Sequence, residues 1–330
     1  MKHPKITARL AVDARAAIAC WVLALLLSGM GASEAQARDA RHVGASRAAC
    51  LLVDTDAGLD DFRAFGVLAP ARRIDAVVVT EGISSVERGH TAVELLLSTG
   101  PSSARVISGE SALHPPDYDW LPEARAGAER LNGFIAEAIS AGGSEASLRA
   151  AVAKSLRGCR RVDVLVLGPW SSFVRYAPVL RRSIGRVVVS GRPLPEVTPD
   201  DFNCVYDLPA CTRAYAMRGL LRDAVWVDLP TDSGDSLTYT PTEEMIARLE
   251  ETRLPGLLRA ALRLDPSQWL ETRLWDDSVA SYLIDAEGFA PEGLHLEPVI
   301  GQDELRTRLV GDINAAPGSR FRRETAHWER

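Results

Sequence analysis

Short apolar runs alternate with amphipathic segments along most of the chain. Runs rich in Val, Ile and Leu predict buried strands, and they cover residues 50–53, 74–80, 104–108, 162–167, 186–190, 224–227 and 296–300. Helical spacing of apolar residues follows residue 58 and recurs over residues 86–97, 124–139 and 145–156 and in a segment that opens at Trp275. This alternation, without internal repeats, predicts an α/β fold with a mostly parallel central sheet flanked by helices.

The first 37 residues have a different character. A basic start, an apolar run from Ala16 to Leu27 and small residues ending in Ala35-Gln36-Ala37 are typical of a secretory signal with an A-x-A cleavage site. A single membrane anchor is the alternative, but the run is too short to span a bilayer comfortably. We expect a signal peptide over residues 1–37, one α/β domain over residues 38–330, a periplasmic or secreted protein, and no membrane attachment after cleavage.

Composition and charge narrow the function further. The 330 residues are 46% hydrophobic and 25% charged, as in an ordinary globular protein that buries a substantial core. The formal net charge is -6 and basic residues form no block, which argues against a nucleic-acid partner. Removal of the signal would take Cys20 and leave an even number of cysteines, as expected of an exported chain with disulfides.

The candidate chemistry begins where the first predicted strand ends. Four aspartates fall within eight residues there, namely Asp54, Asp56, Asp60 and Asp61. Their mutual repulsion calls for a neutralising cation, and carboxylate oxygens suit a hard ion, calcium or magnesium. Gly58 would allow the tight turn that brings Asp56, Asp60 and Asp61 round one centre. Capping of the following helix is the alternative, and it would explain one or two of the four.

The same segment carries a family resemblance. VDTDAGLDD, residues 53–61, resembles the DxDxGxDD signature of the inosine-uridine preferring nucleoside hydrolase family. Four further segments are similar to motifs of that family, in the same order, and the five together cover roughly residues 51–289. They read TEGISSVERGHTAVELL, VLGPWSS, DDFNCVYDLPA and LWDDSVASYLIDAEGF.

The resemblance implies a Rossmann-like homo-oligomer that uses calcium to hydrolyse the N-glycosidic bond of a small-molecule ribonucleoside. Asp56 would activate the water as general base, Asp60 and Asn203 would hold ribose hydroxyls, and Asp54 would orient the loop. The implied calcium ligands are Asp56, Asp61, Asp276 and the main-chain carbonyl of Ser171.

The chain departs from the family pattern at four positions. Ile83 and Ser172 stand where the family has asparagines, and Asp201, a further candidate for substrate contact, replaces a glutamate. Trp275 replaces a histidine proposed as the acid for the leaving base. Tryptophan has no titrating proton, so Trp275 would stack on the nucleobase, or it is a core residue at a helix start. An alternative function is therefore an exported, calcium-bound nucleoside- or sugar-binding protein with weak or no catalysis.

A second alternative comes from Asp54-Thr55-Asp56 after an apolar strand, which is similar to the haloacid dehalogenase phosphatases. Gly58 and the scarcity of lysine, with Lys154 alone after the signal, speak against it. In the nucleoside hydrolase fold the strands after Cys50 and Cys159 are neighbours, which predicts a disulfide between these two residues. Cys204 and Cys211 are predicted to pair across a loop-to-helix junction. Ser233, Asp235 and Tyr239 lie in a predicted loop, facing the base or solvent.

Overall fold

The computed structural model describes residues 49–99, 104–136, 147–221, 223–231, 238–264, 266, 270 and 272–316. All of them belong to one compact unit, residues 47–330. The predicted signal peptide and its cleavage site lie outside the described residues and remain predictions. Within the described ranges, no helix combines the length and apolarity needed to cross a bilayer.

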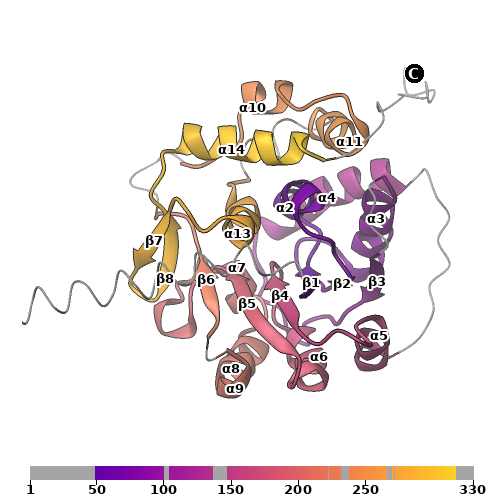
Figure 1. Ribbon diagram of the computed structural model, residues 1–330, viewed down its shortest axis with the longest axis vertical. Helices are drawn as coiled ribbons and strands as arrows, with labels where there is room; N and C mark the ends of the chain where they lie inside the picture. The colour runs from indigo at the N-terminus through magenta and orange to yellow at the C-terminus, as the bar shows by residue number, and fades with distance from the viewer. Residues whose placement is uncertain are drawn as a thin grey trace, which may run out of the picture. The chain divides into compact units, whose positions relative to one another are not determined.

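An eight-stranded sheet forms the centre of this unit, in the order β3-β2-β1-β4-β5-β6-β8-β7. All neighbouring strands are parallel except β7 and β8, which form an antiparallel pair at one edge (Figure 1). The predicted mostly parallel α/β fold is therefore confirmed. The strands are β1 (Cys50–Thr55), β2 (Ala76–Val79), β3 (Arg105–Ser108), β4 (Val162–Val166), β5 (Ile184–Ser190), β6 (Val225–Val227), β7 (Phe289–Glu292) and β8 (His295–Pro298).

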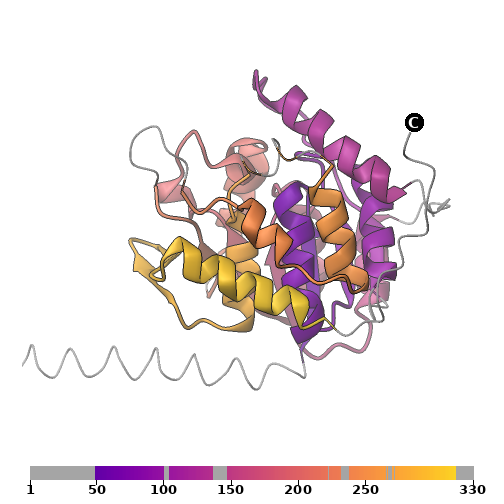
Figure 2. The ribbon, with the colours of Figure 1, turned by 90° about the horizontal axis from the view of Figure 1, so that it is seen from above.

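Helices cover both faces of the sheet because its central strands are apolar on both sides. In β1, Leu51 and Val53 join one core cluster and Leu52 joins the other. Figure 2 shows α10, α11 and α14 lying over α2 and α13 on the first face. The helices of that face are α2 (Leu59–Ala71), α3 (Val86–Ser98), α10 (Glu243–Ala247), α11 (Arg253–Leu262), α13 (Trp275–Ile284) and α14 (Gln302–Asn314).

The second face is covered by shorter helices. Their apolar side chains pack against the other set of strand residues, such as Leu52, Val164 and Val189. These helices are α5 (Leu148–Ser155), α6 (Phe173–Leu180), α8 (Leu208–Ala216) and α9 (Arg218–Leu221). The remaining elements are α4 (Leu121–Ala136), which packs against α3, the one-turn helix α7 (Phe202–Val205) and the 3₁₀ helix η2 (Leu194–Glu196).

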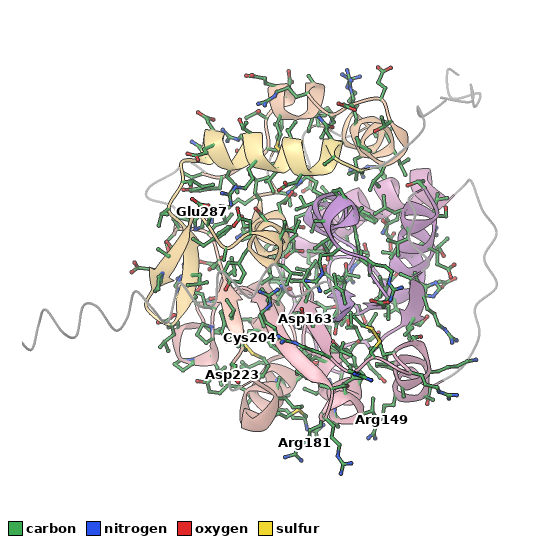
Figure 3. The ribbon with its side chains drawn as sticks, in the orientation of Figure 1. Arg149, Asp163, Arg181, Cys204, Asp223 and Glu287 are labelled. Carbon is green, nitrogen blue, oxygen red and sulfur yellow. A yellow bond between two sulfur atoms is a disulfide. The ribbon has the colours of Figure 1, made fainter. Side chains whose placement is uncertain are left out.

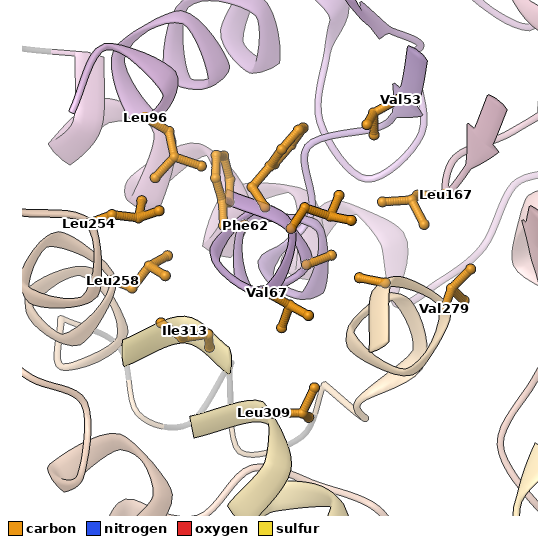
Figure 4. Close-up of a cluster of buried hydrophobic side chains, with 14 of the residues drawn as sticks. Val53, Phe62, Val67, Leu96, Leu167, Leu254, Leu258, Val279, Leu309 and Ile313 are labelled. Carbon is orange, nitrogen blue, oxygen red and sulfur yellow. The ribbon is translucent and has the colours of Figure 1, made fainter. Parts of the chain in front are cut away.

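Helix α2 is enclosed by the sheet and by the helices of its face. Figure 4 shows Phe62 and Val67 of α2 surrounded by Leu96, Leu258 and Ile313 from three other helices. A helix that is apolar on all sides is expected in such a buried position. Beyond the two aspartates of its first turn, the exception within α2 is Arg63, which is 1% exposed.

Both predicted disulfides are confirmed. Cys50 and Cys159 pair with a Cα–Cα distance of 6.0 Å at the amino ends of β1 and β4, where Cys50 is in register with Val162. Cys204 and Cys211 pair with a Cα–Cα distance of 5.2 Å, joining α7 to α8. The first bridge therefore links two neighbouring strands at the amino end of the sheet, whereas the second links two helices outside the sheet.

The structure adds elements that the sequence did not predict. Strand β7 and helix α14 were absent from the expected pattern. Tyr239, expected in a loop facing the base or solvent, instead donates its hydroxyl to the carbonyl of Ile300 at 3.0 Å. Ser233 and Asp235, from the same predicted loop, lie outside the described residues.

Candidate active site

Three carboxylates from two distant segments meet at the carboxyl edge of the sheet. Asp60 and Asp61 open α2, and Asp276 lies in the first turn of α13. One carboxylate oxygen from each lies within 4.8 Å of the others. Helices α2 and α13 lie side by side (Figure 1), and this packing brings together residues more than 200 positions apart in the sequence.

Asp61 is held by the loop that precedes its helix. The Thr55 hydroxyl donates to Asp61 Oδ1, and the Gly58 amide donates to Asp61 Oδ2 at 2.8 Å. The second contact caps the helix start, so the capping alternative holds for Asp61. The predicted role of Gly58 was wrong in detail, because Ala57 adopts the left-handed conformation (φ 55°) while Gly58 has φ -76°. A side chain at Gly58 would instead crowd Asp61, at 3.1 Å from Oδ2.

Asp56 lies between the loops that follow β2 and β4. Its Oδ2 accepts a hydrogen bond from the Ile83 amide at 2.9 Å. A Cβ atom at Gly82 would stand 2.0 Å from that oxygen, and one at Gly168 would stand 2.8 Å from the Asp56 amide nitrogen. Both glycines therefore permit an approach of backbone to Asp56 that no other residue would allow. Asp56 also interacts directly with Asp61.

The carboxylates destabilise one another's charged forms. Burial raises the pKa of Asp56 to about 6, and loss of water contact together with repulsion from Asp61 raises the pKa of Asp60 to about 7. Burial, followed by repulsion from neighbouring carboxylates, holds the pKa values of Asp61 and Asp276 well above the usual range. A cation among these oxygens would favour the ionised forms, and its binding would release protons.

The donor set fits a hard divalent cation. The ligand atoms offered by Asp60, Asp61 and Asp276 are all carboxylate oxygens, and Asp61 and Asp276 are 1% and 3% exposed. Oxygen donors of this kind suit calcium or magnesium. The grouping differs from the expected ligand set in one respect, since it brings Asp60 rather than Asp56 together with Asp61 and Asp276.

A buried ion pair that the sequence did not reveal lies next to these carboxylates. Arg63 on α2 donates Nε to Asp277 Oδ1 at 2.9 Å and Nη2 to Asp277 Oδ2 at 2.9 Å. Both side chains are almost completely buried. The available signal was an arginine in a helix that is apolar beyond its first turn, and a second aspartate after Asp276, but nothing in the sequence pairs them.

Helix α4 contributes a second set of contacts that the sequence did not reveal. Arg125 donates to the carbonyl oxygens of Gly82 at 2.6 Å and Ile83 at 3.2 Å, and to the Tyr206 hydroxyl at 3.1 Å. Asn132 donates to Ser84, which donates in turn to the Ala57 carbonyl at 2.8 Å. These bonds tie the loop after β2 to the loop that carries Asp56.

The serines of the loop after β4 are engaged in internal contacts. Ser171 donates its hydroxyl to Asp207 at 2.6 Å, and Asp207 also caps α8. Ser172 accepts from the Glu110 amide at 2.8 Å, and its hydroxyl donates to the Thr80 hydroxyl oxygen at 2.6 Å. Thr80 in turn donates to Asp54, which is fully buried at the end of β1, and that burial raises the pKa of Asp54 to about 7.

Of the predicted substrate contacts, Asn203 and Asp201 are half-buried and hydrogen-bonded within the protein, whereas Trp275 is exposed. Asn203 donates Nδ2 to the Leu167 carbonyl at 2.5 Å, which holds it at the carboxyl end of β4. Asp201 accepts from the Thr198 amide and hydroxyl within its own turn. Trp275 is 37% exposed, with the Arg273 guanidinium 5.5 Å from its ring centroid. The alternative that Trp275 is a core residue was therefore wrong.

The chain is similar in fold to solved structures of nucleoside hydrolases, so it has the nucleoside hydrolase fold. An inosine-uridine preferring nucleoside hydrolase from Bacillus anthracis has a TM-score of 0.61 at 15% identity, with 81% of this chain covering 99% of that one. A purine-preferring ribonucleoside hydrolase from Gardnerella vaginalis has a TM-score of 0.55 at 16% identity, covering 81% and 100%. A plant nucleoside hydrolase has a TM-score of 0.59 at 14% identity, covering 81% and 99%.

Comparisons of sequence give no match. No protein-family model matches the chain, and no curated protein matches it. The similarity to nucleoside hydrolases thus consists of the five short motifs and of a shared fold at 14–16% sequence identity.

Proposed function

We propose that this protein is an exported, calcium-dependent hydrolase that cleaves the N-glycosidic bond of a ribonucleoside and releases ribose and a free base. One observation carries the proposal. Asp60, Asp61 and Asp276 converge at the carboxyl edge of a nucleoside hydrolase fold, and Asp56 lies against Asp61. Carboxylates at this edge occupy the crevice where open α/β sheets bind their ligands.

The residues that would hold calcium are Asp56, Asp61, Asp276 and the carbonyl of Ser171. Asp60 lies in the same cluster of carboxylates as Asp61 and Asp276. It is therefore a candidate ligand of the metal as well as of a ribose hydroxyl. When bound, calcium would supply positive charge that holds sugar hydroxyls and acidifies a water molecule. The oxygen-only donor set supports a hard cation, and the choice of calcium rests on the family resemblance.

Asp56 would then act as the general base. It accepts a proton from the attacking water while the oxygen forms a bond to the anomeric carbon. The electrons of the breaking C–N bond leave with the nucleobase, which takes its proton from solvent because Trp275 has no titrating proton. The surrounding carboxylates would stabilise positive charge developing on the ribose. Asn203 and Asp201 would contact the sugar, and the exposed ring of Trp275 would stack on the base.

A second candidate is an exported, calcium-bound nucleoside- or sugar-binding protein without effective catalysis. The observation that favours it is the replacement of the family histidine by Trp275. In addition, the Ile83 amide and the Ser172 side chain, at the positions of the family asparagines, are hydrogen-bonded to other residues of the protein. The fold comparison supports either candidate over the phosphatase alternative. Two disulfides agree with an oxidising compartment, periplasmic or extracellular. A homo-oligomer belongs to the proposal as an expectation from the family.

The test combines product detection with metal binding. The purified protein is incubated with calcium and a panel of ribonucleosides, and chromatography measures the free base. Calorimetry then measures calcium binding to the chelator-treated protein and to Asp276→Asn. Base release supports the hydrolase, whereas calcium and nucleoside binding without base release supports the binding protein. Equal calcium binding by both forms, or binding by neither, contradicts the proposed metal site.

A further inference from the structure

The ion pair between Arg63 and Asp277 connects α2 and α13, the two helices that carry the clustered carboxylates. The contact is bidentate, with distances of 2.9 Å for both the Nε–Oδ1 and the Nη2–Oδ2 bonds. Arg63 Nη2 also donates to the carbonyl of Arg273 at 2.9 Å, just before α13. One guanidinium therefore fixes both the backbone that enters α13 and a side chain in its first turn.

The partners stand next to the proposed metal ligands in the sequence. Arg63 lies two positions after Asp61 on α2, and Asp277 directly follows Asp276 on α13. Arg63 is the one basic residue of α2, in a helix otherwise enclosed by apolar side chains. A fixed fork between the two helices determines how far apart Asp276 and the carboxylates of α2 can lie.

We propose that Arg63 and Asp277 are positioning residues for the divalent cation: they hold Asp276 against Asp60 and Asp61 at the spacing that the ion requires. The inference rests on the proposed function, because it concerns the same metal site. Stability alone is a weaker explanation for the pair, since well-packed apolar residues often replace a buried ion pair without loss. Contacts behind metal ligands commonly determine metal affinity by orienting those ligands.

A purely electrostatic role predicts a different outcome. Arg63→Met removes a positive charge beside the carboxylates, so electrostatics alone would tighten calcium binding, and Asp277→Asn removes a negative charge and would weaken it. Positioning predicts that both substitutions weaken binding. Arg63→Lys is the sharpest variant, because lysine keeps the charge and lacks the planar fork. A positioning role predicts that Arg63→Lys binds calcium more weakly than wild type. A purely electrostatic role predicts that its calcium affinity is unchanged.

Asp163 provides a matched control for the loss of a buried ion pair. It is 1% exposed on β4 (Figure 3) and pairs with Arg72 at 3.2 Å. Its register partner on β1 is Leu51, five residues before Asp56, which corresponds to about 16 Å along a strand at about 3.3 Å per residue. Asp163→Asn is therefore expected to change stability and to leave calcium affinity unchanged.

The experiment is calorimetric titration of calcium into the chelator-treated wild type and the four variants, purified from the full chain. Circular dichroism in the absence of calcium first confirms that each variant is folded. We expect Arg63→Lys, Arg63→Met and Asp277→Asn each to weaken the calcium Kd by about 10- to 100-fold. If a single variant does not fold, the double variant Arg63→Met/Asp277→Leu restores an apolar contact, and it is still expected to bind calcium more weakly than wild type.

The outcomes separate this inference from the proposed function. A wild type that binds no calcium overturns both. Wild-type affinity in Arg63→Lys or in the double variant overturns only the positioning role. Tighter binding by Arg63→Met, or equal weakening by Asp163→Asn, also overturns it, in favour of electrostatics or general destabilisation.

Discussion

The absence of a side chain at Gly82 allows Asp56 to occupy its place beside Asp61. A Cβ atom there would stand 2.0 Å from Asp56 Oδ2 and 2.7 Å from its Cγ. Gly82→Ala must therefore displace the side chain of Asp56 or the loop. We expect the variant to lose at least about 10²-fold in kcat/KM, since a misplacement of about 1 Å costs that much. Steady-state kinetics on a nucleoside that the wild type cleaves measures the change.

Gly133 on α4 is the control for this prediction. A Cβ atom at Gly133 meets nothing within 4 Å, and alanine is favoured over glycine in a helix interior by about 1 kcal/mol. Gly133→Ala should therefore raise stability slightly and leave kcat/KM unchanged. Wild-type kinetics in Gly82→Ala would show that Asp56 does not act from the position seen here.

Asp56 is also expected to have a role separate from metal binding. Asp56→Asn keeps the size of the side chain and an oxygen for the Ile83 amide, but it cannot accept a proton from water. The rate at saturating calcium should fall by about 10²- to 10⁴-fold. The measurement is kcat across increasing calcium, compared with Asp276→Asn. Full recovery of Asp56→Asn at high calcium would assign it to metal binding alone.

At the residue scale, the sequence predicted what is contiguous. Asp56, Asp60 and Asp61 fall in one short segment and share a visible motif, and Asp276 was found through a second motif. Arg63 was not predicted, because its partner is 214 positions away and only the packing of α2 on α13 brings them together. A buried arginine always requires a partner, so the sequence could show that one existed but not which residue it was.

At the scale of elements, α4 acts on the site through the loop after β2. Arg125 is the residue of α4 that holds the carbonyls of Gly82 and Ile83, and the Ile83 amide holds Asp56. Arg125→Met keeps most of the side chain's apolar stem and removes these bonds. We expect kcat to fall by about 10- to 100-fold through loss of Asp56 orientation.

The control for Arg125 is an arginine elsewhere on a helix surface. Arg149 lies exposed on α5 (Figure 3), and Arg149→Met should leave kcat unchanged. Equal kcat in wild type and Arg125→Met would show that the loop keeps Asp56 in place without α4. A fall in thermal stability alone, with wild-type kcat, would give Arg125 a purely structural role.

Elements differed in how far the sequence could predict them. The central strands are buried on both faces, so they read as unbroken apolar runs. Strand β7 lies at the sheet edge and contains Pro291, which weakens its strand signal. Helix α14 buries Leu305, Leu309 and Ile313 among ten other residues that are mostly polar, so its pattern is faint until the packing partner is known.

At the scale of the whole molecule, the proposed metal site connects parts that are distant in the chain. Its proposed ligands come from the loop after β1, from α2 and from α13. A cation that binds only the folded state stabilises it by mass action, by about 2.7 kcal/mol at 100 times its Kd. Addition of a chelator should therefore lower the Tm by several degrees. Thermal melts measure the shift, and Asp276→Asn should show little of it; an equal shift in that variant would contradict the site.

The disulfide between Cys50 and Cys159 constrains the same fold from the opposite edge of the sheet. It joins residues 109 positions apart at the amino ends of β1 and β4, whereas Asp56, Asp60 and Asp61 follow the carboxyl end of β1. Closing a loop of about 100 residues removes unfolded-state entropy worth about 4.7 kcal/mol. Cys50→Ser/Cys159→Ser should therefore unfold at a much lower denaturant concentration. Because the bridge lies at the far end of the strands, calcium affinity should stay at the wild-type value. Loss of calcium affinity in a folded double variant would show that the amino and carboxyl ends of the strands are coupled.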